Sequence, residues 1–231
     1  MTIYAISDLH LGLALGKTMD PFGAQWLGHT EKVKLHWQQV VQAEDTVLLP
    51  GDLSWATKWS DFAPDLEFLA SLPGRKVISR GNHDYYWLSK SKMRELLPPE
   101  VVPLEISHTQ VATATESYVV VGVKGWLTPA NPLYKEETDA KYYLRELQRL
   151  QLALEAASLL AEPLIVQMHF PPAANLAEQG FTQVLESFGV QICLYGHLHG
   201  EWHHPLQGIV RGVNYHLVSA DYLNFVPKRI V

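Results

Sequence analysis

Gly81-Asn82-His83-Asp84 is the stretch that decides the fold, because it follows the apolar run 76–79 and ends it abruptly. It places a neutral oxygen donor, an imidazole and a carboxylate in three consecutive positions. These residue types form strands poorly, so we expect a strand to end here. Glycine at position 81 is expected to permit a sharp exit through a positive φ. Loops are rich in such residues, so the stretch becomes specific only because similar groups end other apolar runs.

Five apolar runs end in polar side chains of this kind, namely Asp8 with His10, Asp52, Asn82 with His83 and Asp84, His169, and His197 with His199. Helical patterns separate most of the runs, so we predict that the strands are parallel. The carboxyl ends of parallel strands share one edge of a sheet, where ligands bind. The two pairs spaced i, i+2 are expected to point to one side of an extended segment.

The remaining pattern predicts an α/β protein. Strands are predicted at 2–7, 45–49, 76–79, 163–168 and 190–195, and helices at 25–42, 61–72, 89–97, 136–161 and 181–188. The segment 101–123 is β-rich without a helix, which favours consecutive antiparallel strands, and 208–218 also predicts strands. The loops 12–23 and 126–131 are expected to shape access to the strand ends. We expect one domain over residues 1–231.

Composition restricts the class of protein. The chain has 231 residues, 47% hydrophobic and 18% charged, which is an ordinary globular balance. Its formal charge of −6 argues against binding to duplex nucleic acid. No apolar run approaches the ~18 residues of a membrane span. The single cysteine, Cys193, lies in an apolar run and is interpreted as a buried hydrophobe, and we expect a cytoplasmic protein.

The clustered carboxylates and imidazoles favour metal binding. Bare groups of this kind would repel one another or change their protonation, whereas cations resolve the conflict. The seven plausible ligands are Asp8, His10, Asp52, Asn82, His169, His197 and His199. Oxygen and imidazole donors without thiolate suit Mn, Fe, Zn or Ni. One mononuclear site cannot use all seven, but two cations roughly 3.5–4 Å apart, sharing a carboxylate, can.

In order and spacing, these motifs resemble those of the calcineurin-like metallophosphoesterases. The resemblance rests on Asp8-x-His10, Gly51-Asp52, Gly81-Asn82-His83-Asp84, His169 and Gly196-His197-x-His199. It implies a four-layer α/β/β/α sandwich of two mixed sheets flanked by helices, with a dimetal site at the carboxyl-terminal edge of the strands. It further implies a hydrolase that cleaves a phosphomonoester or phosphodiester of a small substrate by in-line attack of a bridging water or hydroxide.

The resemblance also implies individual roles. One metal would be held by Asp8, His10 and His199, and the other by Asn82, His169 and His197. Asp52 would bridge the two. His83 would lie off the metals and reach the phosphate or the leaving oxygen as a general acid, and Asp84 would orient the His83 imidazole.

Other functions stay open from the sequence. A non-catalytic metal-binding interaction module could share the fold, although every ligand position and His83 are present. A nuclease would use the same chemistry, but the acidic charge disfavours it. A mononuclear hydrolase would leave several ligands without a purpose. Substrate, metal identity and oligomeric state are undetermined.

Other side chains near these motifs are given ordinary interpretations. Aromatic residues close to the ligand loops could stack on a substrate, but packing is the preferred explanation for Trp55, Trp59, Tyr85, Tyr86, Trp87, Trp126 and Trp202. Surface or capping positions are expected for His29, His36, His108, His203, His204 and His216. Arg80 and, more weakly, Lys17, Lys124 and Lys135 could reach a phosphate.

Overall fold

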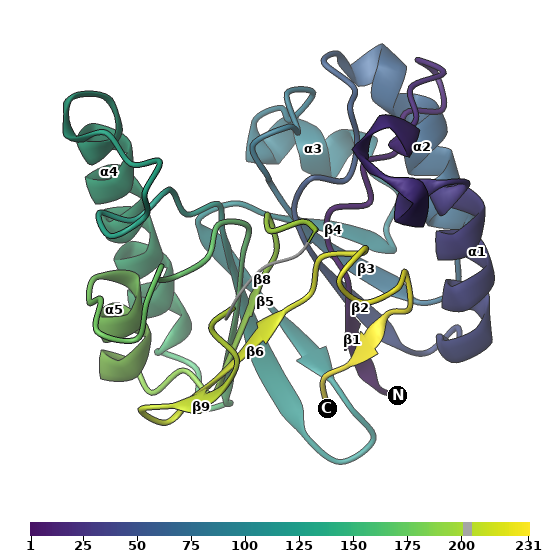
Figure 1. Cartoon of the computed structure of the whole chain (residues 1–231). Helices are drawn as coiled ribbons and strands as arrows, with labels where there is room; N and C mark the ends of the chain where they lie inside the picture. The colour runs from purple at the N-terminus through teal and green to yellow at the C-terminus, as the bar shows by residue number, and fades with distance from the viewer. Residues whose placement is uncertain (201–204) are drawn as a thin grey trace.

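The computed structural model describes residues 1–200 and 205–231, and it contains two β-sheets that pack face to face (Figure 1). The first sheet has the order β11-β1-β2-β3-β4. Its members are β1 (Ile3–Ala5), β2 (Thr46–Pro50), β3 (Arg75–Ser79), β4 (Val101–Leu104) and β11 (Lys228–Arg229). Strands β1 to β4 are parallel, and β11 runs antiparallel to β1.

The second sheet has the order β5-β6-β7-β8-β10-β9. It consists of β5 (Ser107–Ala112), β6 (Ser117–Val123), β7 (Leu164–Met168), β8 (Ile192–Tyr195), β9 (Gly208–Val210) and β10 (Val213–Leu217). Strands β6, β7, β8 and β10 are parallel, and the outer strands β5 and β9 are antiparallel to their neighbours. Both sheets are therefore mixed, as the resemblance to the calcineurin-like metallophosphoesterases implies.

Helices cover the outer face of each sheet, which completes the four layers (Figure 1). The first sheet is covered by α1 (His29–Val40), α2 (Trp59–Ser71) and α3 (Lys90–Leu96), and the second by α4 (Glu136–Ala157) and α5 (Phe181–Ser187). Two short 3₁₀ turns, η1 (Asp20–Phe22) and η2 (Ala24–Trp26), precede α1. No described helix combines the length and the apolar character that crossing a membrane requires.

Three apolar clusters hold the layers together. One lies between the two sheets and includes Ala5, Val77 and Ile165, all fully buried. The other two lie between a sheet and its helices. In α4 the buried residues Leu150, Leu154 and Ala157 recur at helical spacing, so one face of the helix packs on the sheet and the other faces solvent.

The segment 101–123 differs from the expectation of consecutive antiparallel strands. Only β5 and β6 form such a pair, whereas β4 joins the first sheet parallel to β3. The reason is that α3 makes a crossover between β3 and β4, and crossovers produce parallel neighbours. The chain then passes to the second sheet between β4 and β5, so these two strands belong to different layers.

Candidate metal centre

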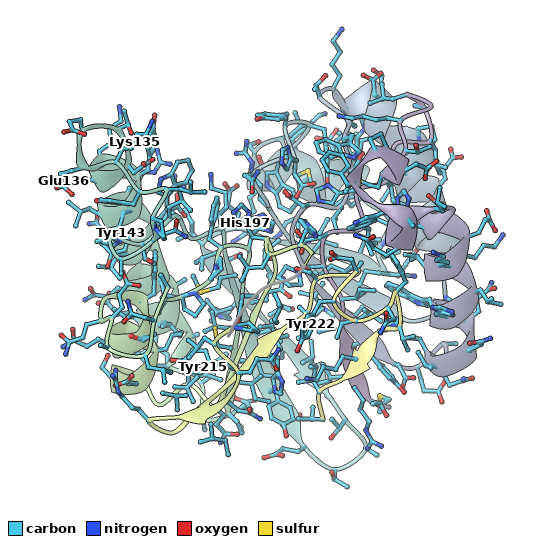
Figure 2. The ribbon with its side chains drawn as sticks, viewed as in Figure 1. Lys135, Glu136, Tyr143, His197, Tyr215 and Tyr222 are labelled. Atoms are coloured by element: carbon cyan, nitrogen blue, oxygen red, sulfur yellow. The ribbon has the colours of Figure 1, made fainter. Side chains whose placement is uncertain are left out.

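The five strand ends meet at one edge of the two packed sheets, and all seven predicted ligands converge there. His197, which follows β8, lies between the halves that carry α4 and α2 (Figure 2). Asp8 is fully buried after β1. Its carboxylate accepts hydrogen bonds from the Ser7 hydroxyl, from Ser219 Oγ at 3.1 Å and from the His197 backbone N–H at 3.1 Å. These donors fix the carboxylate between the sheets.

One group of donors consists of Asp8, His10 and His199, whose ligand atoms lie within 4.8 Å of one another. His199 Nε2 is 3.4 Å from Asp8 Oδ1 and 3.3 Å from His10 Nε2. His10 Nε2 is 4.0 Å from the same Asp8 oxygen. Three donor atoms from two strand ends, those of β1 and β8, therefore face a common point.

The second group surrounds Asp52 and His169. Asp8, Asp52 and His169 also lie with their donor atoms within 4.8 Å. Asp52 Oδ2 is 3.3 Å from His169 Nε2 and 3.9 Å from His10 Nε2, so it lies between the two groups. Asn82 Oδ1 is 2.7 Å from His169 Nε2 and 3.0 Å from His197 Nδ1. The His197/His199 pair is thus divided between the two groups.

Hydrogen bonds at the far nitrogen orient two of these imidazoles. His169 Nδ1 lies 3.1 Å from the Pro50 carbonyl, so Nδ1–H donates and Nε2 faces the other donors. His199 Nδ1 lies 2.9 Å from Asp221 Oδ1, which leaves Nε2 facing Asp8 and His10 in the same way. Such outer partners fix the ring and its tautomer in metal sites.

The protonation of the histidines reflects their crowding. Burial lowers the pKa of His10 to about 4 and of His197 to about 3, with a further contribution from neighbouring imidazoles. Burial also acts to lower the pKa of His169, but the charge and hydrogen bond of Asp52, together with the charges of Asp8 and Asp84, outweigh it and raise that pKa to about 9. Against the same effect of burial, hydrogen bonds to Asp221 and Asp8 raise the pKa of His199 to about 10. The carboxylates therefore raise the pKa of His169 and His199, whereas burial dominates at His10 and His197.

Four of the candidate ligands have an unusual backbone. Asp8, His10, Asp52 and His197 have φ values of 57°, 45°, 52° and 71°. Such left-handed conformations cost of the order of 1–3 kcal/mol for a non-glycine residue and concentrate at functional sites. The segments are therefore not extended, and the i, i+2 argument for the two pairs was wrong in its premise although the side chains do converge.

Glycines allow the strand ends to approach closely. A Cβ on Gly196 would overlap Asp8 Oδ2, and one on Gly81 would overlap Asp52 Oδ1. The expectation of a positive φ at Gly81 is wrong, because its backbone is not left-handed. Its requirement is steric, because the Asp52 carboxylate occupies the space of a side chain.

The residues present fit divalent cations. Two imidazole nitrogens of His10 and His199 approach to 3.3 Å and a carboxylate oxygen lies beside them, an arrangement that bare groups disfavour and a cation would satisfy. The donors are oxygen and imidazole nitrogen, with no thiolate among them. Asp52 lies between the two groups of donors.

His83 and Asp84 have different surroundings. The half-buried His83 ring lies 5.6 Å from the His10 ring and 4.6 Å from that of Trp55, and burial lowers its pKa. Asp84 is fully buried, and its carboxylate accepts the backbone N–H groups of Gly81, Asp52, Leu53 and Ser54 at 2.7, 2.8, 2.9 and 3.3 Å. No hydrogen bond joins Asp84 to the His83 imidazole in the described chain. Instead of orienting the imidazole, Asp84 ties the loop after β2 to the loop after β3.

An aromatic wall borders this side of the site. Trp55 stacks on His10 at 4.8 Å and contacts His83, so it packs against the site itself. Lys17 Nζ lies 3.5 Å from the centre of the Trp55 ring, and Phe22 stacks on that ring from outside at 6.4 Å. The loop 12–23 therefore brings an exposed cation close to His83, which agrees with the expectation that this loop shapes access.

Two residues near the site differ from the expectations drawn from the sequence: Asp221 was not among the predicted site residues, and His29 was expected at the surface or at a cap. Asp221 follows β10 and holds both His199 Nδ1 and the Gly200 N–H, each at 2.9 Å. Its position could have been predicted, because Asp221 follows an apolar run as the candidate ligands do. His29 is buried, not exposed, and its Nε2 lies 3.3 Å from the His10 carbonyl.

The remaining expectations have mixed outcomes. Cys193 is buried, as predicted, and burial raises the pKa of its thiol. Tyr86 is buried and stacks on Phe62, whereas Tyr85 is exposed. Trp202, His203 and His204 lie outside the described residues.

Comparisons with known proteins agree with this geometry. The family model described as calcineurin-like phosphoesterase matches residues 1–201. Phosphopantetheinyl hydrolase from Mycobacterium tuberculosis has a similar fold, with a TM-score of 0.62, 14% identity, and coverage of 100% of this chain and 95% of that one. A protein of unknown function from Aquifex aeolicus gives 0.52, 14%, 99% and 95% for the same measures.

Identities this low support the fold alone. No match was found among curated proteins. The match over most of the chain, together with two mixed sheets and an Asp/His cluster at their edge, shows that the chain belongs to the calcineurin-like phosphoesterase family.

Proposed function

We propose that the protein hydrolyses a small phosphomonoester or phosphodiester with the help of two divalent cations. The observation that carries this proposal is the convergence of two donor groups that share Asp8, with Asp52 between them. Carboxylates that can be shared between cations are typical of sites that act on phosphate esters. The metals would be Mn, Fe, Zn or Ni, which accept this donor set.

The proposed ligand assignment follows the two groups. Asp8, His10 and His199 would hold one cation, and Asn82, His169 and His197 the other, with Asp52 shared. When bound, the cations would lower the pKa of a water and neutralise phosphate oxygens. Asp221 and the Pro50 carbonyl keep the Nε2 atoms of His199 and His169 directed toward the site.

His83 is the proposed proton donor to the leaving oxygen. It lies beside the ligand His10 without belonging to either donor group. Its half-buried position leaves it accessible to a substrate. A positioned imidazole typically contributes 10²- to 10⁴-fold as a general acid or base. Asp84 supports this role indirectly, because it fixes the loop that carries His83.

Two alternatives use the same fold. A non-catalytic metal-binding module would not need His83 beside the cluster. A nuclease would need a basic surface for the nucleic-acid backbone, whereas the chain has a formal charge of −6. A small phosphorylated substrate suits both observations better. We further propose a cytoplasmic location, because the one cysteine is buried and cannot form a disulfide within the chain.

The test is hydrolysis of p-nitrophenyl phosphate and bis-p-nitrophenyl phosphate, each with added Mn and with chelator. We expect metal-dependent turnover of at least one, lost in Asp52→Asn and reduced about 10²-fold in His83→Ala. The ratio of the two rates distinguishes a monoesterase from a diesterase. Metal binding without turnover of either would favour the binding module, and turnover in chelator would refute the proposal.

A further inference from the structure

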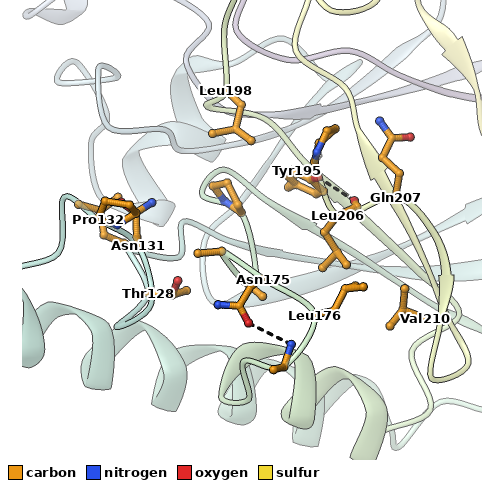
Figure 3. A pocket seen from close by; sticks show the side chains of 16 residues that line it. Thr128, Asn131, Pro132, Asn175, Leu176, Tyr195, Leu198, Leu206, Gln207 and Val210 are labelled. Atoms are coloured by element: carbon orange, nitrogen blue, oxygen red, sulfur yellow. Dashed lines mark hydrogen bonds between the residues drawn. The ribbon is translucent and has the colours of Figure 1, made fainter. Parts of the chain in front are cut away.

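A large cavity opens on the side of the metal centre that faces α4 and α5. Its volume is about 870 Å³, which lies within the range of ligand pockets. The loop after β6 and the loop after β7 surround it, together with Leu198, Leu206 and Gln207 from between β8 and β9 (Figure 3). We call it the ester pocket. It is distinct from the aromatic wall beside His83, because neither Trp55 nor Lys17 is among its described lining residues.

Several residues that line the ester pocket are close neighbours in sequence of the candidate metal ligands. Leu198, which lines it, stands between the ligands His197 and His199. Tyr195 lines it two residues before His197, and Pro171 lines it two residues after His169. A substrate whose phosphate reached these histidines would therefore have the pocket within reach of its organic part.

The described lining carries no Asp, Glu, Lys or Arg. It does contain polar side chains, and one polar atom of each of the following three has a hydrogen-bond partner. Thr128 Oγ1 donates to Glu178, Asn131 Oδ1 accepts from the Leu133 N–H, and Asn175 Oδ1 accepts from the Ala177 N–H.

The other two polar side chains of the lining also have one hydrogen-bond partner each. The Tyr195 hydroxyl donates to the Leu206 carbonyl, a bond drawn in Figure 3, and Gln207 Nε2 donates to the Tyr222 hydroxyl. The rest of the described wall is apolar, as with Leu176 and Val210. Among these described lining residues a charged group would lose its hydration without a charged partner, whereas an uncharged apolar group would gain by leaving water.

We propose that the ester pocket receives an uncharged, largely apolar organic group of the phosphate ester. This assignment rests on the proposed function and narrows its substrate class. A polyphosphate chain is a poor match for the described lining, which carries no charged side chain. An alkyl or aryl group attached through the ester oxygen matches both its chemistry and its place beside His197 and His199.

Inhibition by alkyl phosphates of increasing length tests the proposal. Methyl, butyl and hexyl phosphate would compete with p-nitrophenyl phosphate in the Mn-loaded enzyme. Full burial of each added CH₂ corresponds to about a fourfold gain in affinity, so we expect hexyl phosphate to bind at least thirtyfold more tightly than methyl phosphate. The doubly substituted variant Leu176→Glu/Val210→Glu should reduce that ratio about tenfold.

Matched controls separate this effect from misfolding. Leu176 is 63% exposed, but Val210 packs partly buried against the second core cluster, so thermal unfolding must show that the double variant is folded. Leu159→Glu changes an 86% exposed leucine that does not line the pocket, and it should keep the kcat and KM of p-nitrophenyl phosphate. The double variant should keep kcat but raise KM, because p-nitrophenyl phosphate is an aryl ester. Equal affinities for methyl and hexyl phosphate, or an unchanged ratio in the double variant, would overturn the ester pocket while leaving the proposed function in place.

A second measurement does not depend on turnover. N-phenyl-1-naphthylamine, an uncharged apolar dye, should fluoresce when it binds the protein in chelator, and hexanol should displace it. The double variant should bind the dye about tenfold more weakly, whereas Leu159→Glu should not. Equal dye binding in all three proteins would contradict the assignment. Dye binding of the expected pattern without any metal-dependent turnover would remove the proposed function, and with it the ester as occupant.

Discussion

Asp221→Asn should weaken metal binding, although Asp221 belongs to neither donor group. Its two carboxylate oxygens accept from His199 Nδ1 and from the Gly200 N–H, each at 2.9 Å. An asparagine keeps one acceptor oxygen, but its NH₂ group then faces the other donor. His199 loses the carboxylate that holds its Nε2 atom toward Asp8 and His10.

The expected magnitude follows from these contacts. Loss of an outer partner of a metal-binding histidine typically reduces metal affinity 10- to 100-fold, or about 1.4–2.7 kcal/mol. The His199 side chain is 29% exposed, so water replaces part of the lost interaction. We therefore expect a loss near the lower end, about tenfold, for the weaker of the two Mn sites or for both.

Competition with a chelating indicator measures the Mn affinity of both proteins directly. Asp61→Asn is the matched control, because Asp61 accepts only a hydroxyl hydrogen bond from Ser60 and lies on α2, away from the donor groups. The control should keep the affinity of the unmodified protein. Mn affinities for Asp221→Asn within threefold of the unmodified protein would refute the role given to Asp221.

Three further predictions concern specificity, pH and packing. Lys17→Met removes the cation beside His83. It should reduce kcat/KM about tenfold for the dianion p-nitrophenyl phosphate but only about threefold for the monoanion bis-p-nitrophenyl phosphate. The control Lys34→Met, an exposed change on α1, should alter neither kcat/KM, and equal losses for both substrates would argue against the charge effect. Burial and Lys228 lower the pKa of His216 to about 4, so protonation of the unfolded chain lowers stability as pH falls from 6.5 toward 4. Between pH 7 and 5 in chelator, His216→Gln should therefore lose less unfolding free energy than the unmodified protein, by roughly 1 kcal/mol after allowing for its half-buried position, and parallel pH profiles would contradict this. Leu150→Ala should cost about 2–5 kcal/mol of unfolding free energy in urea because Leu150 is fully buried against the second sheet, whereas Leu152→Ala, at a 52% exposed position, should cost less than about 1 kcal/mol.

Much of the fold could be predicted because apolar runs and helical patterns alternate clearly. The strand ends at Asp8, Asp52 and His169 are correct, since a block of polar side chains cannot continue a buried strand. The division of residues 101–123 between two sheets could not be predicted, because both possible partners of β4 offer apolar surfaces. Strand β11 has only two residues, too few to show any period.

Ligand convergence could be predicted better than the way it is achieved. The strand-end argument brings His10 and His199 together, but nothing in it shows the left-handed backbone at Asp8 and His197. The pairing of Asp221 with His199 depends on where β10 places a residue 22 positions further along the chain. The same limit applies to Asp84, whose four backbone partners come from two loops that meet only in the folded protein.

Turnover as a function of bound Mn tests the central claim most directly. Metal-free protein would receive measured equivalents of Mn, and hydrolysis of bis-p-nitrophenyl phosphate and p-nitrophenyl phosphate would be followed at each step. The two donor groups that share Asp8 predict that activity rises until two Mn are bound per chain, and that Asp52→Asn stays inactive at every ratio while remaining folded. Full activity at one Mn per chain, or in the presence of chelator, would contradict the account.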